Sequence, residues 1–106
     1  MMKISVKSLH FSADSKLIEY VESKISRLSR YFEPTVDAEV HLKLQDTGGR
    51  IQDKITEIKL RVPGKWLMDK KTGRTFEEAV DQSVDTLKRQ LLRYKDRHTA
   101  QHVRSE

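Results

Sequence analysis

Cysteine is absent from this chain of 106 residues, which excludes disulfides, thiolate metal sites and cysteine nucleophiles. No apolar run approaches the roughly 18 residues that a membrane-spanning helix requires, and the N-terminus lacks the apolar core of a signal peptide. Glycine is scarce, and Gly48, Gly49 and Gly64 fit turns better than a phosphate-cradling loop. These absences predict a cytoplasmic protein with no membrane partner and no small-molecule substrate.

Residues suited to catalysis or metal binding are also few. The histidines are scattered, except that His98 and His102 stand one helical turn apart, with no third ligand in view. No serine lies in the strand-to-helix turn that exposes a nucleophile in hydrolases. We therefore expect no enzymatic activity, no cofactor and no bound metal.

Positive charge is in excess, with 21 lysines and arginines against 16 acids and a net charge of +5. A chain of this length forms one domain, which buries about two-thirds of the surface that its unfolded state exposes. We expect that domain to cover residues 1–98 and residues 99–106 to form a disordered tail. Nearly all of the excess charge falls in residues 88–97. Solubility is the simplest explanation for so small a net charge.

The spacing of apolar residues predicts six elements. Alternation with period two predicts strands at residues 3–9, 36–45, 57–62 and 65–69, with turns at 47–49 and 63–64 and a polar connection at 70–74. Helical spacing predicts one helix from a cap at Asp14 to about Tyr31, and a second from about Phe76 to Arg97 after a capping box at Thr75. The order strand, helix, three strands, helix predicts an α+β fold of two layers, with a four-stranded sheet and both helices packed on one face. Trp66 is expected in the core or at its edge.

The second predicted helix carries an array of bases along its second half. Arg89, Arg93 and Arg97 recur every four residues on one flank, where like charges repel by a few tenths of a kcal/mol per pair. Asp85 can relieve only Arg89, while Lys88 and Lys95 add charge on the opposite flank. The helix dipole favours bases in the last turn, but it needs fewer than are present. The array therefore indicates a polyanionic partner.

The first predicted helix also has a basic flank, formed by Lys24, Arg27 and Arg30. If both helices pack on one side of the sheet, two basic ridges can flank one shallow groove that suits a phosphate backbone. The outer sheet face has no aromatic residue at its predicted positions, so it lacks the platform on which RNA-recognition motifs stack bases. We accordingly predict that RNA is bound by Lys24, Arg27, Arg30, Lys88, Arg89, Arg93, Lys95 and Arg97.

The segment AVDQSVDTLKRQLLRYKDR, residues 79–97, is similar to the signature of the ribosome hibernation promoting factors. That family includes the ribosome-associated inhibitor and is also called the sigma-54 modulation protein family. The pattern is met by Ala79, Val80, Asp81, Asp85, Leu87, Arg89, Gln90, Leu91, Arg93 and Lys95. The first helix adds Leu17, residues 20–24, 27–28 and 30–32, so the likeness covers nearly all of residues 2–98.

This resemblance implies a short-form hibernation factor that binds the small ribosomal subunit in the cleft between head and body, where messenger and transfer RNA lie. It implies repression of translation in idle or starved cells, as in stationary phase, by a protein that is monomeric off the ribosome. The family's contacts with ribosomal RNA fall on Lys24, Arg27 and Arg30, and on Arg89, Arg93 and Arg97. We add Lys88 and Lys95 because of their spacing along the second predicted helix.

Two alternatives stay open at this point. One is a protein-interaction module that modulates a transcription factor, which would need exposed apolar residues. The other is an RNA-binding domain that reads the shape of double-stranded RNA and has no preference for ribosomes.

Overall fold

The chain folds into a four-stranded sheet with two helices, and the computed structural model describes residues 2–9, 11–32, 37–46 and 52–104. Among these, side chains are described except at positions 46, 52 and 98–104. The elements along the chain are β1 (Lys3–Leu9), α1 (Ser15–Ser26), the 3₁₀ helix η1 (Arg27–Arg30), β2 (Asp37–Asp46), β3 (Gln52–Val62), β4 (Lys65–Gly73) and α2 (Phe76–Arg104). This order confirms the predicted α+β fold.

The sheet has the strand order β1-β2-β3-β4. β1 lies parallel to β2, so the chain must cross over between them, and α1 forms that crossover. The other two pairs are antiparallel. β3 and β4 are joined at Pro63-Gly64, where Gly64 has a φ of +87°. A glycine with positive φ is what the second central position of the predicted turn requires.

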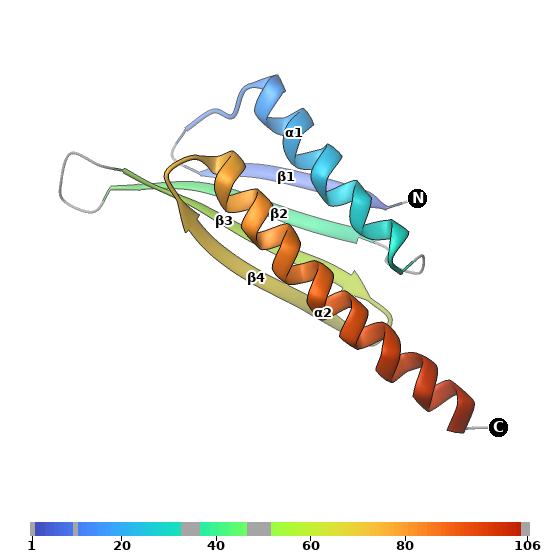
Figure 1. Cartoon of the computed structure of the whole chain (residues 1–106). Coiled ribbons are helices and arrows are strands. Elements are labelled where there is room, and N and C mark those ends of the chain that lie inside the picture. The colour runs from blue at the N-terminus through green and yellow to red at the C-terminus, as the bar shows by residue number, and fades with distance from the viewer. Residues whose placement is uncertain (1, 10, 33–36, 47–51, 105–106) are drawn as a thin grey trace.

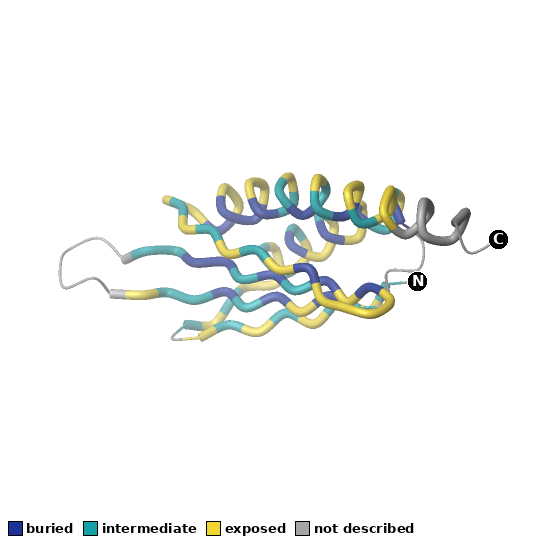
Figure 2. The backbone as a smooth tube through the Cα atoms, turned by 90° about the horizontal axis from the view of Figure 1, so that it is seen from below, coloured by how far each residue is buried: buried dark blue, intermediate teal, exposed yellow. Residues whose placement is uncertain are grey.

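Both helices cover the same face of the sheet and run side by side across it (Figure 1). Seen edge-on, the buried residues lie between the helical layer and the sheet (Figure 2). The core is built from the apolar stripes of the helices and the inward positions of the strands, including Val21, Ile25, Leu28, Val40, Leu42, Ile58, Leu60, Val80, Leu87 and Leu91. Because these stripes are used in the core, the charged flanks of α1 and α2 are left at the surface.

The two predicted helix caps are present. The backbone N–H of Leu17 donates to Asp14 Oδ1 at 2.8 Å, and that of Glu78 donates to Thr75 Oγ1 at 3.0 Å. Each bond satisfies one of the N–H groups that a helix leaves free at its start. α1 and α2 therefore begin where the sequence predicts.

Several predicted boundaries were wrong. β4 continues to Gly73, so residues 70–73 are strand and not a connection, because the long β3 gives them partners up to Lys54↔Gly73. The first helix changes to 3₁₀ geometry at Arg27. α2 extends to Arg104 because its sequence has no proline or glycine that would stop it. The predicted turn at 47–49 lies outside the described residues.

The prediction that Trp66 lies in the core or at its edge was also wrong. Trp66 is 43% exposed and Met68 is 57% exposed, whereas Leu67 between them is 6% exposed. Successive side chains of a strand point to opposite faces, and the register pairs Trp66 with Arg61 on the outer face. Leu67 therefore belongs to the core, and Trp66 is an exposed aromatic residue on the outer face of the sheet.

Thr56 provides a test of the packing between sheet and helices. Its side chain is fully buried, and its hydroxyl has no hydrogen-bond partner among the described residues. A buried polar group without a partner costs about 1–3 kcal/mol. We expect Thr56→Val to raise the free energy of unfolding by about 1 kcal/mol in urea denaturation. A loss of stability would show that the hydroxyl is satisfied.

Candidate nucleic-acid interface

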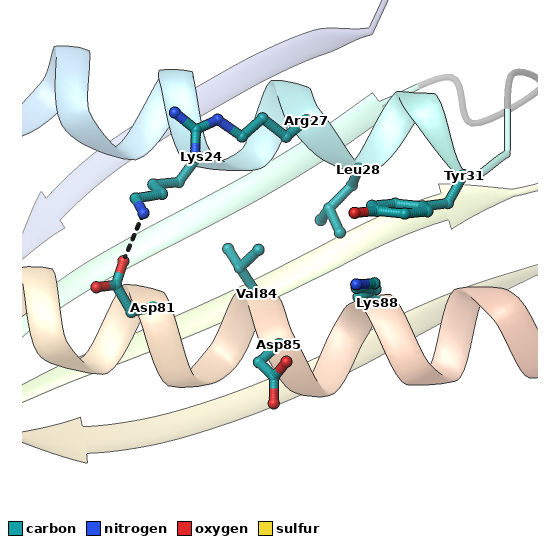
Figure 3. Close-up of a pocket in the computed structure, with 8 residues that line it drawn as sticks. All are labelled: Lys24, Arg27, Leu28, Tyr31, Asp81, Val84, Asp85 and Lys88. Carbon is teal, nitrogen blue, oxygen red and sulfur yellow. Dashed lines mark ion pairs between the residues drawn. The ribbon is translucent and has the colours of Figure 1, made fainter.

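A shallow groove separates the two helices on the outer surface of the helical layer. We call it the interhelical groove; it has a volume of about 370 Å³ and is lined by Lys24, Arg27, Leu28, Tyr31, Asp81, Val84, Asp85 and Lys88. Leu28 and Val84 are its apolar members, and the charged side chains come from both helices (Figure 3). The groove is therefore amphipathic, and its charge is mixed.

Asp81 is the centre of the polar contacts between the helices. Its Oδ1 accepts a hydrogen bond of 2.7 Å from the Tyr20 hydroxyl. The same oxygen lies 3.5 Å from Lys24 Nζ, and Figure 3 shows this ion pair. The hydrogen bond to Asp81, with help from burial and the same negative charge, raises the pKa of Tyr20 to about 12. Asp81 thus ties α1 to α2 and neutralises part of the groove's positive charge.

The other bases of this groove are less restrained. Lys88 Nζ lies 4.9 Å from the centre of the Tyr31 ring. This cation–π contact joins α2 to the end of the first helical segment, the name used here for α1 and η1 together with Tyr31. Arg27 is exposed, as is Arg30. Both belong to η1, where residues three apart eclipse each other, so Arg27 and Arg30 lie on the same side of the chain.

A second hollow lies on the other flank of α2, beside the β3–β4 turn. We call it the turn-side hollow; its volume is about 240 Å³ and it is lined by Lys65, Leu67, Gln90, Arg93, Tyr94 and Arg97. Two hydrogen bonds hold its walls together. Gln90 Nε2 donates to the Met68 carbonyl at 3.2 Å, and the Tyr94 hydroxyl donates to the Pro63 carbonyl.

The structure distributes the predicted bases over both flanks of α2. Lys24, Arg27 and Lys88 line the interhelical groove, and Arg93 and Arg97 line the turn-side hollow. The remaining three, Arg30, Arg89 and Lys95, are exposed outside both hollows.

The prediction that two basic ridges flank one shallow groove was therefore wrong for Arg93 and Arg97, which line a different hollow. Each step along α2 rotates the side chain by about 100°. Lys88 consequently faces α1, whereas Arg93 and Arg97 face β4. All of the predicted bases still belong to the layer formed by the helices.

Two acids of α2, Asp81 and Asp85, form ion pairs with some of the predicted bases. Asp85 pairs with Arg89 as predicted, with the oxygen and nitrogen 3.5 Å apart. Both side chains are largely exposed, and such pairs contribute about 0–1 kcal/mol. The pairing of Lys24 with Asp81 was not predicted, because the two residues lie on different helices.

Lys65 is the basic residue of these hollows that sequence reasoning missed. It follows Gly64 directly and has Val62 as its partner across the turn. Its Nζ lies 5.6 Å from the centre of the Tyr94 ring, so it reaches over to α2. The predicted turn at Pro63-Gly64 could have identified Lys65. If the β3–β4 hairpin packs under the second half of α2, the first residue of β4 lies beside the bases of that helix.

Two other kinds of site are absent from the described part of the chain. No helix there is long and apolar enough to cross a membrane. That part also holds no cluster of three or more His, Asp or Glu side chains suited to a metal. The side chains of His98 and His102 lie outside the described residues.

Comparison with known families matches residues 4–99 to the model of the sigma 54 modulation protein / S30EA ribosomal protein family. The chain belongs to this family. The match includes both helices up to residue 99, all four strands, and the lining of both hollows.

Curated relatives of this family carry names that refer to ribosome hibernation. The ribosome hibernation promotion factor of Deinococcus radiodurans is 36% identical over 83 residues, which are 78% of this chain and 44% of that protein. The ribosome hibernation promoting factor of Pseudomonas putida is 25% identical over 91% of this chain and 89% of its own length. The chain therefore spans less than half of the first relative and most of the second.

Solved structures of two proteins share the fold. The N-terminal domain of Thermus thermophilus Protein Y has a TM-score of 0.75 and 26% identity, with 89% of this chain and 99% of that one covered. A ribosomal subunit interface protein from Coxiella burnetii has a TM-score of 0.77 and 19% identity, with 91% and 99% covered. The second likeness supports the fold alone.

The bond between Tyr20 and Asp81 predicts a pH dependence. The pKa of Tyr20 rises from 10.0 to about 12 in the folded protein, so the contact contributes its full stability below pH 10 and loses it as the pH passes 12. The difference in unfolding free energy between wild type and Tyr20→Phe should shrink across that interval. A difference that stays constant up to pH 12 would show that the phenol is not held by Asp81.

Proposed function

We propose that this protein is a ribosome hibernation factor that binds the small ribosomal subunit through the basic surface of its helical layer. It occupies the cleft between head and body, where messenger and transfer RNA would lie, and it represses translation in idle or starved cells. Family membership supports this proposal, together with the hibernation factors that match the chain at 36% and 25% identity.

The position of the bases is the observation that carries the proposal. Lys24, Arg27 and Arg30 come from the first helical segment, and Lys88, Arg89, Arg93, Lys95 and Arg97 come from α2. Each neutralised phosphate releases counterions from the nucleic acid, so a surface of this kind gains affinity in proportion to its contacts. It reads the path of the RNA backbone more than the bases.

Repression in this proposal requires no chemical step. A domain lodged in the cleft excludes messenger and transfer RNA by volume, and initiation complexes must compete with it for the same RNA surface. The protein acts in the cytoplasm, where ribosomes are, and it needs neither a cofactor nor a membrane. Its affinity follows ionic strength because its contacts are largely electrostatic.

One observation favours the alternative of a protein-interaction module. Trp66 and Met68 are exposed side by side on the outer face of β4, and aromatic residues and methionine are enriched at protein interfaces. That face is the one opposite the helices. A protein-interaction module would therefore bind its partner through the outer sheet face and not through the helices. Mutations on one face or the other can distinguish the two functions.

We expect Arg89→Glu combined with Arg93→Glu to abolish co-sedimentation with purified small subunits. Both side chains are exposed. Arg89 gives up an exposed ion pair with Asp85 and a hydrogen bond of 3.4 Å to the Thr86 hydroxyl, and contacts of this kind add little stability at the surface, so the fold should persist. Reversal replaces two attractions to phosphate by two repulsions.

The matched control is Lys7→Glu combined with Lys59→Glu, which changes the net charge equally. These residues lie on the outer face of β1 and β3, away from the helices. The control should still co-sediment with small subunits. Equal loss in both double variants, or none in either, would contradict the proposal, and loss with Trp66→Ala alone would favour the protein-interaction module.

A further inference from the structure

We propose that Lys65, Arg93 and Arg97 form a single seat for an RNA phosphate group, in the turn-side hollow and separate from the interhelical groove. This inference rests on the proposed function, because it takes the ligand to be ribosomal RNA. It adds Lys65, a residue of the sheet, to a binding surface otherwise formed by the helices.

Charge distinguishes the turn-side hollow from the interhelical groove. The groove is lined by two acids, Asp81 and Asp85, and Asp81 pairs with its Lys24. Three bases and no acid line the turn-side hollow in the described part of the chain. None of the three bases forms an ion pair with a described carboxylate, so their mutual repulsion is left for an external anion to relieve.

The geometry of the hollow suits one phosphate group. Arg93 and Arg97 are one helical turn apart on the flank of α2 that faces β4, and Lys65 approaches from the strand. A guanidinium can donate two parallel hydrogen bonds to phosphate oxygens, and the lysine ammonium adds a compact charge. Three cations can thus surround one anion from two elements of the fold.

The position of Lys65 is set by the contacts beneath it. Its ammonium lies over the Tyr94 ring, and the Tyr94 hydroxyl is bonded to the Pro63 carbonyl just before the turn. Gln90 bonds the same helix to the Met68 carbonyl of β4. These bonds hold α2 and the hairpin together, so the two elements that carry the three cations need no rearrangement to receive a phosphate.

The seat has a measurable consequence in the salt dependence of binding. Each phosphate contact contributes about 0.7–0.9 to the slope of log affinity against log salt concentration. We expect Lys65→Gln to weaken binding to purified small subunits severalfold and to reduce the slope by at most that amount, because Arg93 and Arg97 still contact the same phosphate. Lys7→Gln, an exposed lysine on the outer face of β1, removes the same charge and should leave both quantities unchanged.

A double-mutant cycle tests whether the three bases share one phosphate. Loss of Lys65 should cost less in an Arg97→Gln background than in wild type, because both contacts belong to the same anion. Lys7→Gln and Arg97→Gln should combine additively. Strict additivity of Lys65→Gln and Arg97→Gln would overturn the single seat.

Two further variants separate failure of the seat from failure of the proposed function. Lys65→Arg keeps the charge and should bind like wild type; if it binds as weakly as Lys65→Gln, the role of Lys65 is structural and the seat is overturned. If Lys65→Gln binds like Lys7→Gln while reversal of Arg89 and Arg93 abolishes binding, the seat is wrong and the proposed function stands. If reversal also has no effect, both fail.

Discussion

Burial of one face of the sheet by two amphipathic helices is the constraint on which the rest of this structure depends. Val21, Ile25 and Leu28 of α1 and η1, and Val80, Leu87 and Leu91 of α2, are buried in the core between the helices and the sheet. Once those stripes are committed to the core, the flanks can point only sideways or outward. Every base that the helices contribute to the binding surface lies where it does because these stripes are buried.

The same constraint separates the charges of α2 into three groups. Lys88 faces the first helix, where Asp81 and Asp85 also lie, whereas Arg93 and Arg97 face the hairpin in a hollow whose described lining contains no acid. Arg89 remains at the surface with Asp85. A helix that carries bases on both flanks can contact RNA on two sides. Asp81 and Asp85 reduce the positive charge on the side that faces the first helix, and no acid lines the hollow on the other side among the described residues.

Local chemistry made most of the fold predictable from sequence. Period-two alternation identified the strands, and Asp14 and Thr75 marked the helix starts because capping depends on residues within one turn. What could not be predicted depends on residues far apart in the chain. The length of β4 follows from its pairing with β3, the exposure of Trp66 follows from the choice of Leu67 for the core, and Lys65 joins Arg93 only after the hairpin has packed under α2.

The central claim is that the helical layer is the surface that faces ribosomal RNA. An electron cryo-microscopy reconstruction of the small subunit with the bound protein tests it most directly. The account predicts α1 and α2 against ribosomal RNA in the cleft between head and body, with Arg89, Arg93 and Arg97 near phosphates and Trp66 turned away. A complex in which the outer sheet face contacts the subunit, with both helices in solvent, would contradict it.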